Sequence, residues 1–361
     1  PKPEPVEPPS PEAIDLAIRR GVDFLLQRQN TDGSWGSHHT GRPGNVFAPV
    51  PGAHHAFRAG TTSLCVAALI QCGDTRPDTA AALDRAEHWM ALNLPSLRRA
   101  TPEAIYNNWG HIYAVQALSL MYRRHDGNPK RQEAILAHLD QQIERLDRYE
   151  FLNGGWAYYD FNAHTQRPSD ASTSFMTAAG LIALDEARRL NVEIPARLTD
   201  RAIRSIQRQR KPDFSYLYAD SFVHYPMHPI NRPGGSLGRS QACNAALRIW
   251  GDKAVTDAVL TAWLDRLFAR NGWLDIGRKR PIPHESWFAV AGYFFYFGHY
   301  YAARCIELLP DQQQPPYWDQ LGHVLVKLQE ADGSWWDFPL YDYHKQYGTA
   351  FALMSLSRCR N

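Results

Sequence analysis

The chain has 361 residues, 44% of them apolar and 21% charged, so it is long enough and apolar enough to bury a large core. Its net charge is +2, and its lysines and arginines are scattered, so it carries no basic patch of the kind that binds nucleic acid or a membrane surface. No apolar run reaches the roughly 18 residues of a membrane span, and the five cysteines form no CxxC pair, which argues against a transmembrane helix, a disulfide framework and a structural zinc site.

The first ten residues, PKPEPVEPPS, predict a proline-rich extended tether ahead of one domain at residues 11–361. A globular domain rarely begins with such a segment. This favours a chain trimmed at its N-terminus, exported to the periplasm or the extracellular space after removal of a signal. The alternative is an arbitrary boundary in a cytoplasmic protein.

From residue 11 onwards, two kinds of predicted helix alternate along the chain. The first kind is amphipathic and charged, with apolar residues at helical spacing such as Ile14, Ile18 and Val22. The second kind, such as TTSLCVAALIQC at 61–72, has almost no charged face and is typical of a helix buried all round. The charged helices are expected at 11–29, 80–94, 131–149, 195–210, 252–270 and 317–331, and the apolar ones at 61–72, 108–123, 171–189, 238–250, 286–309 and 347–359.

A repeat of about sixty residues underlies this alternation. Two heptapeptides, QNTDGSW at 29–35 and QEADGSW at 329–335, match almost letter for letter, and weaker echoes end at Trp156, Tyr216 and Trp273. The five aromatic positions are separated by 121, 60, 57 and 62 residues, so one degenerate copy is expected near residue 95. The glycine of each turn ends the charged helix, because glycine accepts the left-handed conformation of a C-cap.

Six such copies predict an all-α protein that forms a closed (α/α)6 toroid, with the apolar helices in an inner ring and the charged helices outside. An open solenoid is the alternative, but both terminal repeats keep the intact motif, whereas a solenoid ends in atypical polar caps. Closure predicts that the termini are adjacent. The heptads predict that Trp35 and Trp335 are buried clamps between repeats.

The heptad resembles the QW motif of the prenyltransferase and squalene-cyclase repeat superfamily, whose terpenoid cyclases share the α/α toroid. The resemblance covers essentially the whole chain after residue 11 and implies the fold, while no subfamily's catalytic signature is present. Hopene-type cyclases use Asp-x-Asp-Asp, and this chain has no Asp-Asp pair; class I terpene synthases, of a different helical fold, use an aspartate-rich metal motif that is also missing. Prenyltransferase subunits use Asp-x-Cys, and complement-like thioester domains use Gly-Cys-Gly-Glu-Gln, neither of which occurs here.

The turns are expected to deliver the chain to the N-termini of the inner helices, which converge on one mouth of the ring. Free N–H groups and helix dipoles favour anionic groups there. The six connecting segments also hold ten of the fifteen histidines: His38, His39, His54, His55, His111, His164, His224, His228, His284 and His344. The resemblance likewise implies a functional site at this rim.

Asn107 and His111 share a helix face and can combine an amide that neutralises a carboxylate with a histidine acid/base, with Trp109 beside them. The alternative is a helix capped by Asn108 with His111 packed at the mouth. Asp170 opens the third inner helix, either as an acid or as a plain N-cap.

His284 and Glu285 open the fifth inner helix, where imidazole and carboxylate can pair or Glu285 can simply stabilise the first turn. Arg239 is a lone cation suited to an anionic ligand. The predicted catalytic residues are His111, Asp170, His284, Glu285 and Tyr347, and the predicted ligand contacts are Asn107, Trp109, Arg239, Trp287 and His344.

Asp220, His224 and His228 are the candidate ligands of a divalent metal, the one cofactor hypothesis that residue type supports. One helical turn would separate the histidines only in a helical loop. Pro226 and Pro229 argue against such a loop.

Three functions stay open at this point. The first is an isoprenoid cyclase or transferase with an aromatic cavity, in which ring faces stabilise a carbocation. The second is a polysaccharide lyase-like enzyme that uses Asn, His, Arg and Tyr at the mouth for β-elimination on a uronate. The third is a non-catalytic module that binds a protein or a peptide. A deep apolar cavity would favour the first, an open polar-aromatic one the second, and a filled ring the third.

Overall fold

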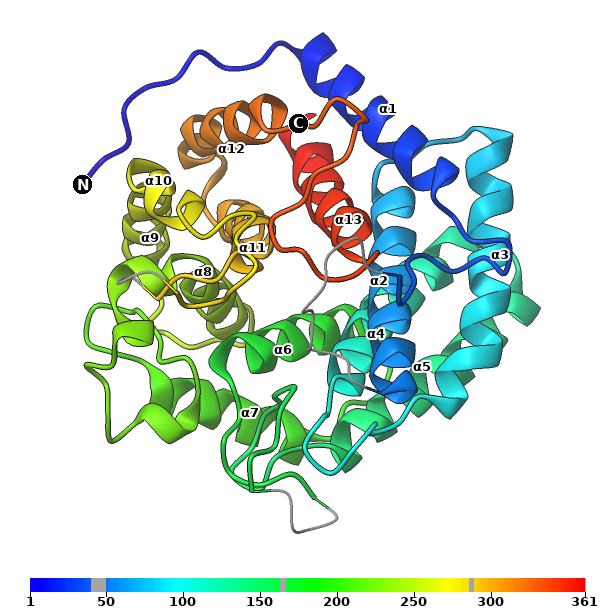
Figure 1. Cartoon of the computed structure of the whole chain (residues 1–361), viewed down its shortest axis with the longest axis horizontal. Helices are drawn as coiled ribbons and strands as arrows, with labels where there is room; N and C mark the ends of the chain where they lie inside the picture. Colours follow the sequence, from blue (N-terminus) through cyan, green and yellow to red (C-terminus); the bar gives the residue numbers. More distant parts are fainter. Residues whose placement is uncertain (40–49, 163–166, 286–288, 361) are drawn as a thin grey trace.

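The computed structural model describes residues 1–39, 50–162, 167–285 and 289–360. Within these ranges every regular element is a helix, and β pairing is confined to isolated bridges. The helices are arranged around a centre, as Figure 1 shows. No helix in the described ranges is both long enough and apolar enough to cross a membrane. The predicted all-α toroid is confirmed.

An inner ring is formed by helices that are buried on nearly every side. They are α2 (Pro51–Gln71), α4 (Asn107–Arg124), α6 (Ser174–Arg188), α8 (Pro233–Ile249), α11 (Phe294–Glu307) and α13 (His344–Leu356). Each of these helices packs against the next one, and α13 packs against α2 again. The ring is therefore closed, and an open solenoid is excluded.

Amphipathic helices lie outside this ring and bury one face against it. They are α1 (Pro11–Gln27), α3 (Pro77–Asn93), α5 (Pro129–Arg148), α7 (Ala196–Gln209), α9 (Asp257–Ala269) and α12 (Pro315–Lys327). One further short helix, α10 (Asn271–Asp275), occupies the position where an Asp-Gly-like turn was expected at Trp273. A strict six-plus-six arrangement therefore stays a prediction.

Several helix starts differ from the predicted ones, and proline explains two of them. α2 begins at Pro51 and α8 at Pro233, because proline at the first helical position is pre-organised for a helix and gives up no needed N–H. As a result, His54 and His55 lie inside α2 and not in the loop expected before it.

The tryptophans of the repeat are buried and are held by the same two hydrogen bonds in three repeats. Trp35 donates its indole N–H to Leu25 O (2.7 Å) and its backbone N–H to Thr62 Oγ1 (3.0 Å). Trp156 and Trp335 do the same with Leu146 O and Thr177 Oγ1, and with Leu325 O and Thr349 Oγ1. Each tryptophan thus joins the end of an outer helix, through its ring, to an inner helix, through its backbone, and the predicted burial of Trp35 and Trp335 is confirmed.

The glutamine of the heptad joins neighbouring repeats. Gln29 Nε2 donates to Ala82 O on α3 (2.8 Å), and Gln329 Nε2 donates to Ala17 O on α1 (2.8 Å). The second contact links the last outer helix to the first, so the motif itself closes the outer layer.

The two ends of the folded domain meet, but the tether carries residue 1 away from them (Figure 1). Arg360 Nε donates to Asp15 Oδ1 at 2.8 Å, which places the C-terminal segment against α1. The tether runs along α12, where Gln320 Nε2 donates to Glu4 O at 2.6 Å. Adjacent ends are thus found for residues 11–360, while the first ten residues lie extended on the outer layer.

Candidate functional site

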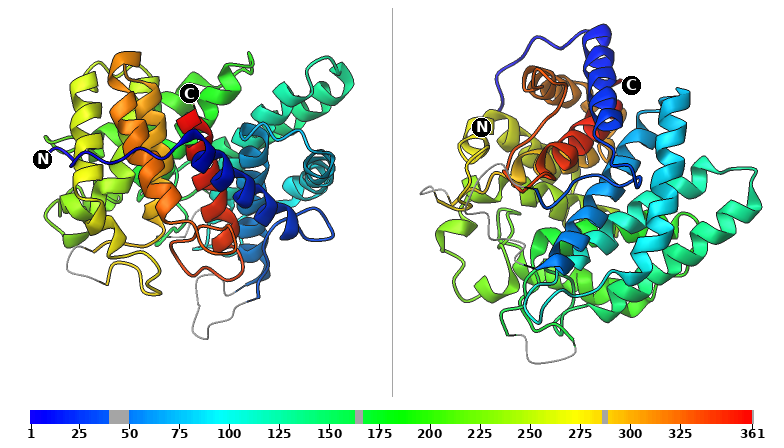
Figure 2. Two further views of the ribbon diagram at one scale, coloured as in Figure 1. Left: turned by 90° about the horizontal axis from the view of Figure 1, so that it is seen from above. Right: turned by 45° about the vertical axis from the view of Figure 1, so that its right-hand side comes forward.

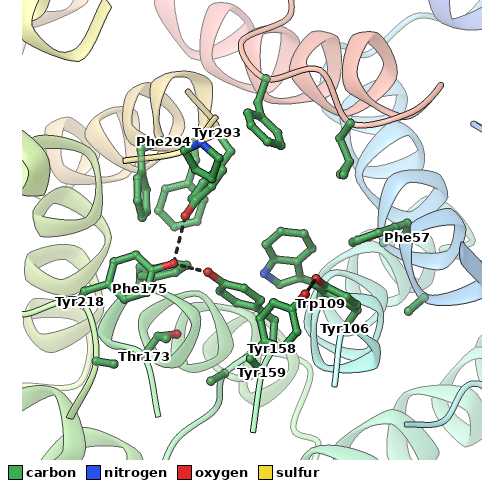
Figure 3. A pocket seen from close by; sticks show the side chains of 18 of the residues that line it. Phe57, Tyr106, Trp109, Tyr158, Tyr159, Thr173, Phe175, Tyr218, Tyr293 and Phe294 are labelled. Carbon is green, nitrogen blue, oxygen red and sulfur yellow. Dashed lines mark hydrogen bonds between the residues drawn. The ribbon is translucent and has the colours of Figure 1, made fainter. Parts of the chain in front are cut away.

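The inner ring encloses a cavity of about 470 Å³ whose wall is mainly aromatic (Figure 3). Its ring-bearing lining residues include Phe57, Tyr106, Trp109, Tyr158, Phe175, Tyr218, Tyr293, Phe294, Tyr347 and Phe351. Among the described residues, no aspartate, glutamate, lysine or arginine lines it. The cavity is therefore apolar, with phenol hydroxyls and one imidazole as its main polar groups.

The lining residues come from the N-terminal halves of the inner helices and from the segments just before them. The described parts of the loops before α11 and α13 project from the same edge of the ring, the lower edge in the left view of Figure 2. This is the rim at which a functional site was expected. The geometry thus places a cavity behind the predicted mouth.

Three of the predicted site residues, Trp109, His284 and Tyr347, line this cavity. His284 does not pair with Glu285: its Nδ1 lies 2.7 Å from Ala289 O, and its Nε2 lies 3.0 Å from Tyr293 Oη. Burial lowers the pKa of His284 to about 4, so the ring is neutral at neutral pH.

Asn107 and His111 share a face of α4, as predicted, but that face is turned away from the cavity. His111 Nδ1 lies 2.7 Å from Gln142 Oε1 on α5, and burial lowers the pKa of His111 to about 4. Asn107 is also buried, and its amide atoms have no hydrogen-bond partner among the described residues. Residues four apart, such as Asn107 and His111, lie on one side of a helix. Trp109 is two residues from each of them and therefore lies on the opposite side, facing the cavity.

Arg239 is fully buried behind the cavity wall and does not reach the mouth. Its guanidinium donates to three backbone carbonyls, those of Tyr216, Gly235 and Ile230, and lies 5.7 Å from the ring centroid of Tyr218. Burial lowers its pKa to about 10, and the cation persists because the carbonyls solvate it.

The other rim residues do not join the cavity. Asp170 is exposed and does not cap α6, whose N-cap is Thr173. Glu285 is exposed and makes a long ion pair with Arg280 (3.8 Å). His344 begins α13 and places its Nδ1 2.6 Å from Tyr341 O. Two residues of the sequence-based list, Trp287 and His164, lie outside the described residues.

The structure does not bring the three candidate metal ligands together in the described part of the chain. Asp220 is held by Asn153 and by Arg208 Nη2 (3.0 Å), while His224 is exposed on the surface. His228 is an N-cap whose Nδ1 accepts from Ile230 N (3.2 Å). No group of three His, Cys, Asp or Glu side chains able to hold a metal occurs in the described part of the chain. The prolines give this loop short 3₁₀ turns and not the helix that would align the histidines.

Comparison with solved structures supports the closed helical ring described above. The chain is an α/α toroid. It resembles the type II terpene cyclase MstE from Scytonema, with a TM-score of 0.54 and 15% identity, covering 98% of this chain and 99% of that one. No family model matches the sequence.

Two glycosidase-type toroids are similar to a comparable degree. One is an inactive variant of the α-1,6-mannanase GH76A of Salegentibacter sp. HEL1_6 in complex with α-1,6-mannotriose, with a TM-score of 0.58 and 9% identity over 96% of this chain and 99% of that one. The other is a possible member of the GH105 family from Salmonella enterica serovar Paratyphi A, with a TM-score of 0.56 and 12% identity over 98% and 95%. Identities this low establish the fold alone.

The toroid also contains an acid that the sequence analysis missed. Asp337 is fully buried, and its carboxylate accepts from Tyr347 Oη (2.7 Å) and from the backbone N–H of Tyr296 (3.0 Å). Burial raises its pKa to about 7 against these two hydrogen bonds. A carboxyl group that is partly protonated at neutral pH thus lies directly behind the cavity-lining Tyr347.

A second missed feature is a row of tyrosine hydroxyls. Tyr158 Oη bonds to Tyr218 Oη, which lies 3.0 Å from Tyr293 Oη, and Tyr293 bonds to His284. The repeat register would have revealed most of these residues: Tyr158, Tyr218 and Asp337 each stand two positions after the clamp aromatics Trp156, Tyr216 and Trp335.

Proposed function

We propose that this toroid binds an extended apolar ligand of the isoprenoid class in its central cavity and transforms it through a carbocation. The aromatic wall, with no charged side chain among its described members, is the observation that carries the proposal. Such a wall excludes water, matches an apolar chain and presents ring faces that stabilise a transient cation without trapping it chemically.

Asp337 is the group from which an acid-initiated reaction would take its proton. Its raised pKa of about 7 leaves about half of the molecules protonated at this group at neutral pH, and its contact with Tyr347 connects it to the cavity. In this scheme the Tyr347 O–H turns from Asp337 to the ligand and gives up its proton, while protonated Asp337 donates its own proton to the phenol oxygen and ends as the carboxylate.

A carbohydrate enzyme is the second candidate, since two similar toroids are a mannanase and a possible GH105 member. Glycoside hydrolysis ordinarily needs a pair of carboxyl groups flanking the scissile bond. The described cavity lining provides none, and the carboxyl group of Asp337 lies behind the hydroxyl of Tyr347.

The test compares ligand classes and blocks the cavity. We expect an acyclic isoprenoid hydrocarbon to bind and to change the fluorescence of the cavity-lining Trp109, whereas mannotriose does neither. Ala171→Trp places a bulky ring among the lining residues at a partly exposed position and should abolish this binding.

Ala81→Trp is the matched control, because Ala81 is an exposed residue on α3, away from the cavity. Binding of the sugar and not of the hydrocarbon would overturn the proposal in favour of the carbohydrate enzyme. Equal loss of hydrocarbon binding in both variants would show that the cavity is not the binding site.

A further inference from the structure

The row of hydroxyls on the cavity wall has a fixed direction. Figure 3 shows the hydroxyl groups of Tyr158, Tyr218 and Tyr293 meeting at one side of the cavity. The three tyrosines come from loops before three different inner helices, so ring closure alone brings them together. The row ends at His284, whose Nε2 lies 3.0 Å from Tyr293 Oη.

The backbone determines which nitrogen of His284 carries the proton. Ala289 O lies 2.7 Å from Nδ1, and a carbonyl oxygen only accepts hydrogen bonds, so Nδ1 must be the donor. A neutral imidazole has one N–H, which leaves Nε2 as an acceptor. Burial, with the positive charge of Arg239 nearby, keeps the ring neutral at neutral pH.

The backbone conformation of His284 and Ala289 indicates that the surrounding structure holds this hydrogen bond in place. His284 and Ala289 both adopt left-handed conformations, with φ of 61° and 52°, which residues with a Cβ rarely adopt. Such strain persists only where the surroundings enforce it. The imidazole and its carbonyl acceptor are therefore held in place and do not drift to other partners.

Because His284 Nε2 is an acceptor, the donor and the acceptor of every hydrogen bond along the row are determined. Tyr293 must donate to His284, Tyr218 must then donate to Tyr293, and Tyr158 must donate to Tyr218, because each phenol has a single proton. At the end of the row, Tyr158 Oη has no proton left for the cavity. It presents only lone pairs there.

Trp109 supplies the complementary group. Its ring centroid lies 5.5 Å from that of Tyr158, and in Figure 3 its indole nitrogen points toward Tyr158. An indole N–H donates and never accepts. A hydroxyl placed between the two residues can donate to Tyr158 and accept from Trp109, whereas a carbonyl can only accept and an ether has no proton to give.

We infer that the ligand of this cavity is an apolar molecule with a hydroxyl group, and that this hydroxyl donates to Tyr158 Oη. The inference rests on the proposed apolar-ligand function and adds the class of polar group that the ligand carries. A carbonyl in the same place would put its oxygen lone pairs next to those of Tyr158 Oη, and no hydrogen bond would form between the two groups.

Binding of three matched probes at neutral pH tests the inference: an acyclic sesquiterpene alcohol, its aldehyde and its methyl ether. We expect the alcohol to bind roughly tenfold more tightly than either of the others, the effect of one buried hydrogen bond gained against one left unmade. Tyr158→Phe should remove this preference and leave the three probes with similar affinities.

Tyr106→Phe is the control, since it removes a hydroxyl from the same wall that bonds to Tyr159 and lies outside the row. The preference for the alcohol should survive in it. If all three probes bind wild-type protein equally, or if Tyr158→Phe keeps the preference, the inference is overturned while the apolar-ligand function stands. If none binds, the proposed function fails and the inference fails with it.

A second measurement is independent of any ligand. Nitrogen NMR of the histidine rings should find His284 neutral, with its proton on Nδ1, at neutral pH. A proton on Nε2, or a cationic ring, would reverse the row and overturn the inference whatever the probes do. His284→Gln identifies the signal by its disappearance.

Discussion

Burial sets the protonation of Asp337, the residue from which the proposed chemistry takes its proton. Asp337 has two hydrogen-bond donors that favour its carboxylate, yet removal from water outweighs them and raises its pKa to about 7. The unfolded chain binds that proton only below about pH 4. The folded protein therefore holds an extra proton between these two values, and its stability must depend on pH there.

Proton binding is linked to folding, and this linkage decides whether the stability rises or falls with pH. The contribution of protonated Asp337 is fully present below about pH 4 and is lost as the pH rises through about 7. We expect the free energy of unfolding to fall with a slope of up to about 1.4 kcal/mol per pH unit across that window. Asp337→Asn, whose amide is neutral at every pH, should lack this component of the slope.

Urea unfolding of both proteins at several pH values across the window measures the difference. The variant should be the more stable of the two above neutrality, because wild type must then bury a charge. Parallel slopes in the two proteins would mean that Asp337 is ionised throughout and supplies no proton.

Among the structural elements, the helix-ending turn and its tryptophan are the recurring unit. In three repeats, the indole N–H binds the end of the outer helix, and the backbone N–H binds a threonine on the inner helix. The glycine of the turn is just as constrained: a Cβ at Gly33 would lie 2.4 Å from Arg85 O on the next outer helix. The turn therefore contacts both the neighbouring outer helix and the inner helix.

We expect Trp335→Ala to lower the free energy of unfolding by about 3–5 kcal/mol, because it removes a large, fully buried ring and leaves a cavity. Trp336→Ala is the matched control: this neighbouring residue is partly exposed, so its loss should cost less. Chemical denaturation of both variants gives the comparison. Unchanged stability in Trp335→Ala, together with lost ligand binding, would assign this ring to the site and not to the scaffold.

The whole molecule is a ring whose closure depends on contacts between the two ends of the chain. Gln329 reaches Ala17 O, and Arg20 donates to Gln329 Oε1 (3.3 Å) and to the carbonyls of Glu330 and Ala331. These contacts join segments more than 300 residues apart, so they form only after the other repeats are in place. Non-local contacts of this kind are the slowest to form on folding.

We expect Gln329→Leu to loosen this junction, since it removes the hydrogen bonds to Ala17 O and Gly333 O. Hydrogen exchange should accelerate in α1 and α12 and remain slow in the inner ring. Gln29→Leu, which breaks the equivalent bond to Ala82 O, should accelerate exchange in α3 instead. Identical exchange patterns in the two variants would contradict a junction-specific role.

The sequence by itself determined the all-helical fold, the period of about sixty residues, the burial of Trp35 and Trp335 and the rim at which the cavity opens. These are consequences of local pattern: apolar periodicity, helix-stopping glycines and a motif whose tryptophan makes the same contacts in three repeats. The tertiary structure alone decided which rim side chains meet. Asn107 and His111 share a face by helical spacing, yet that face is turned toward α5, while Asp337 and the tyrosine row converge on the cavity from separate repeats. The side of the ring to which a side chain points, and the depth of burial that sets its pKa, depend on how all the repeats pack together. A local sequence pattern therefore cannot predict them.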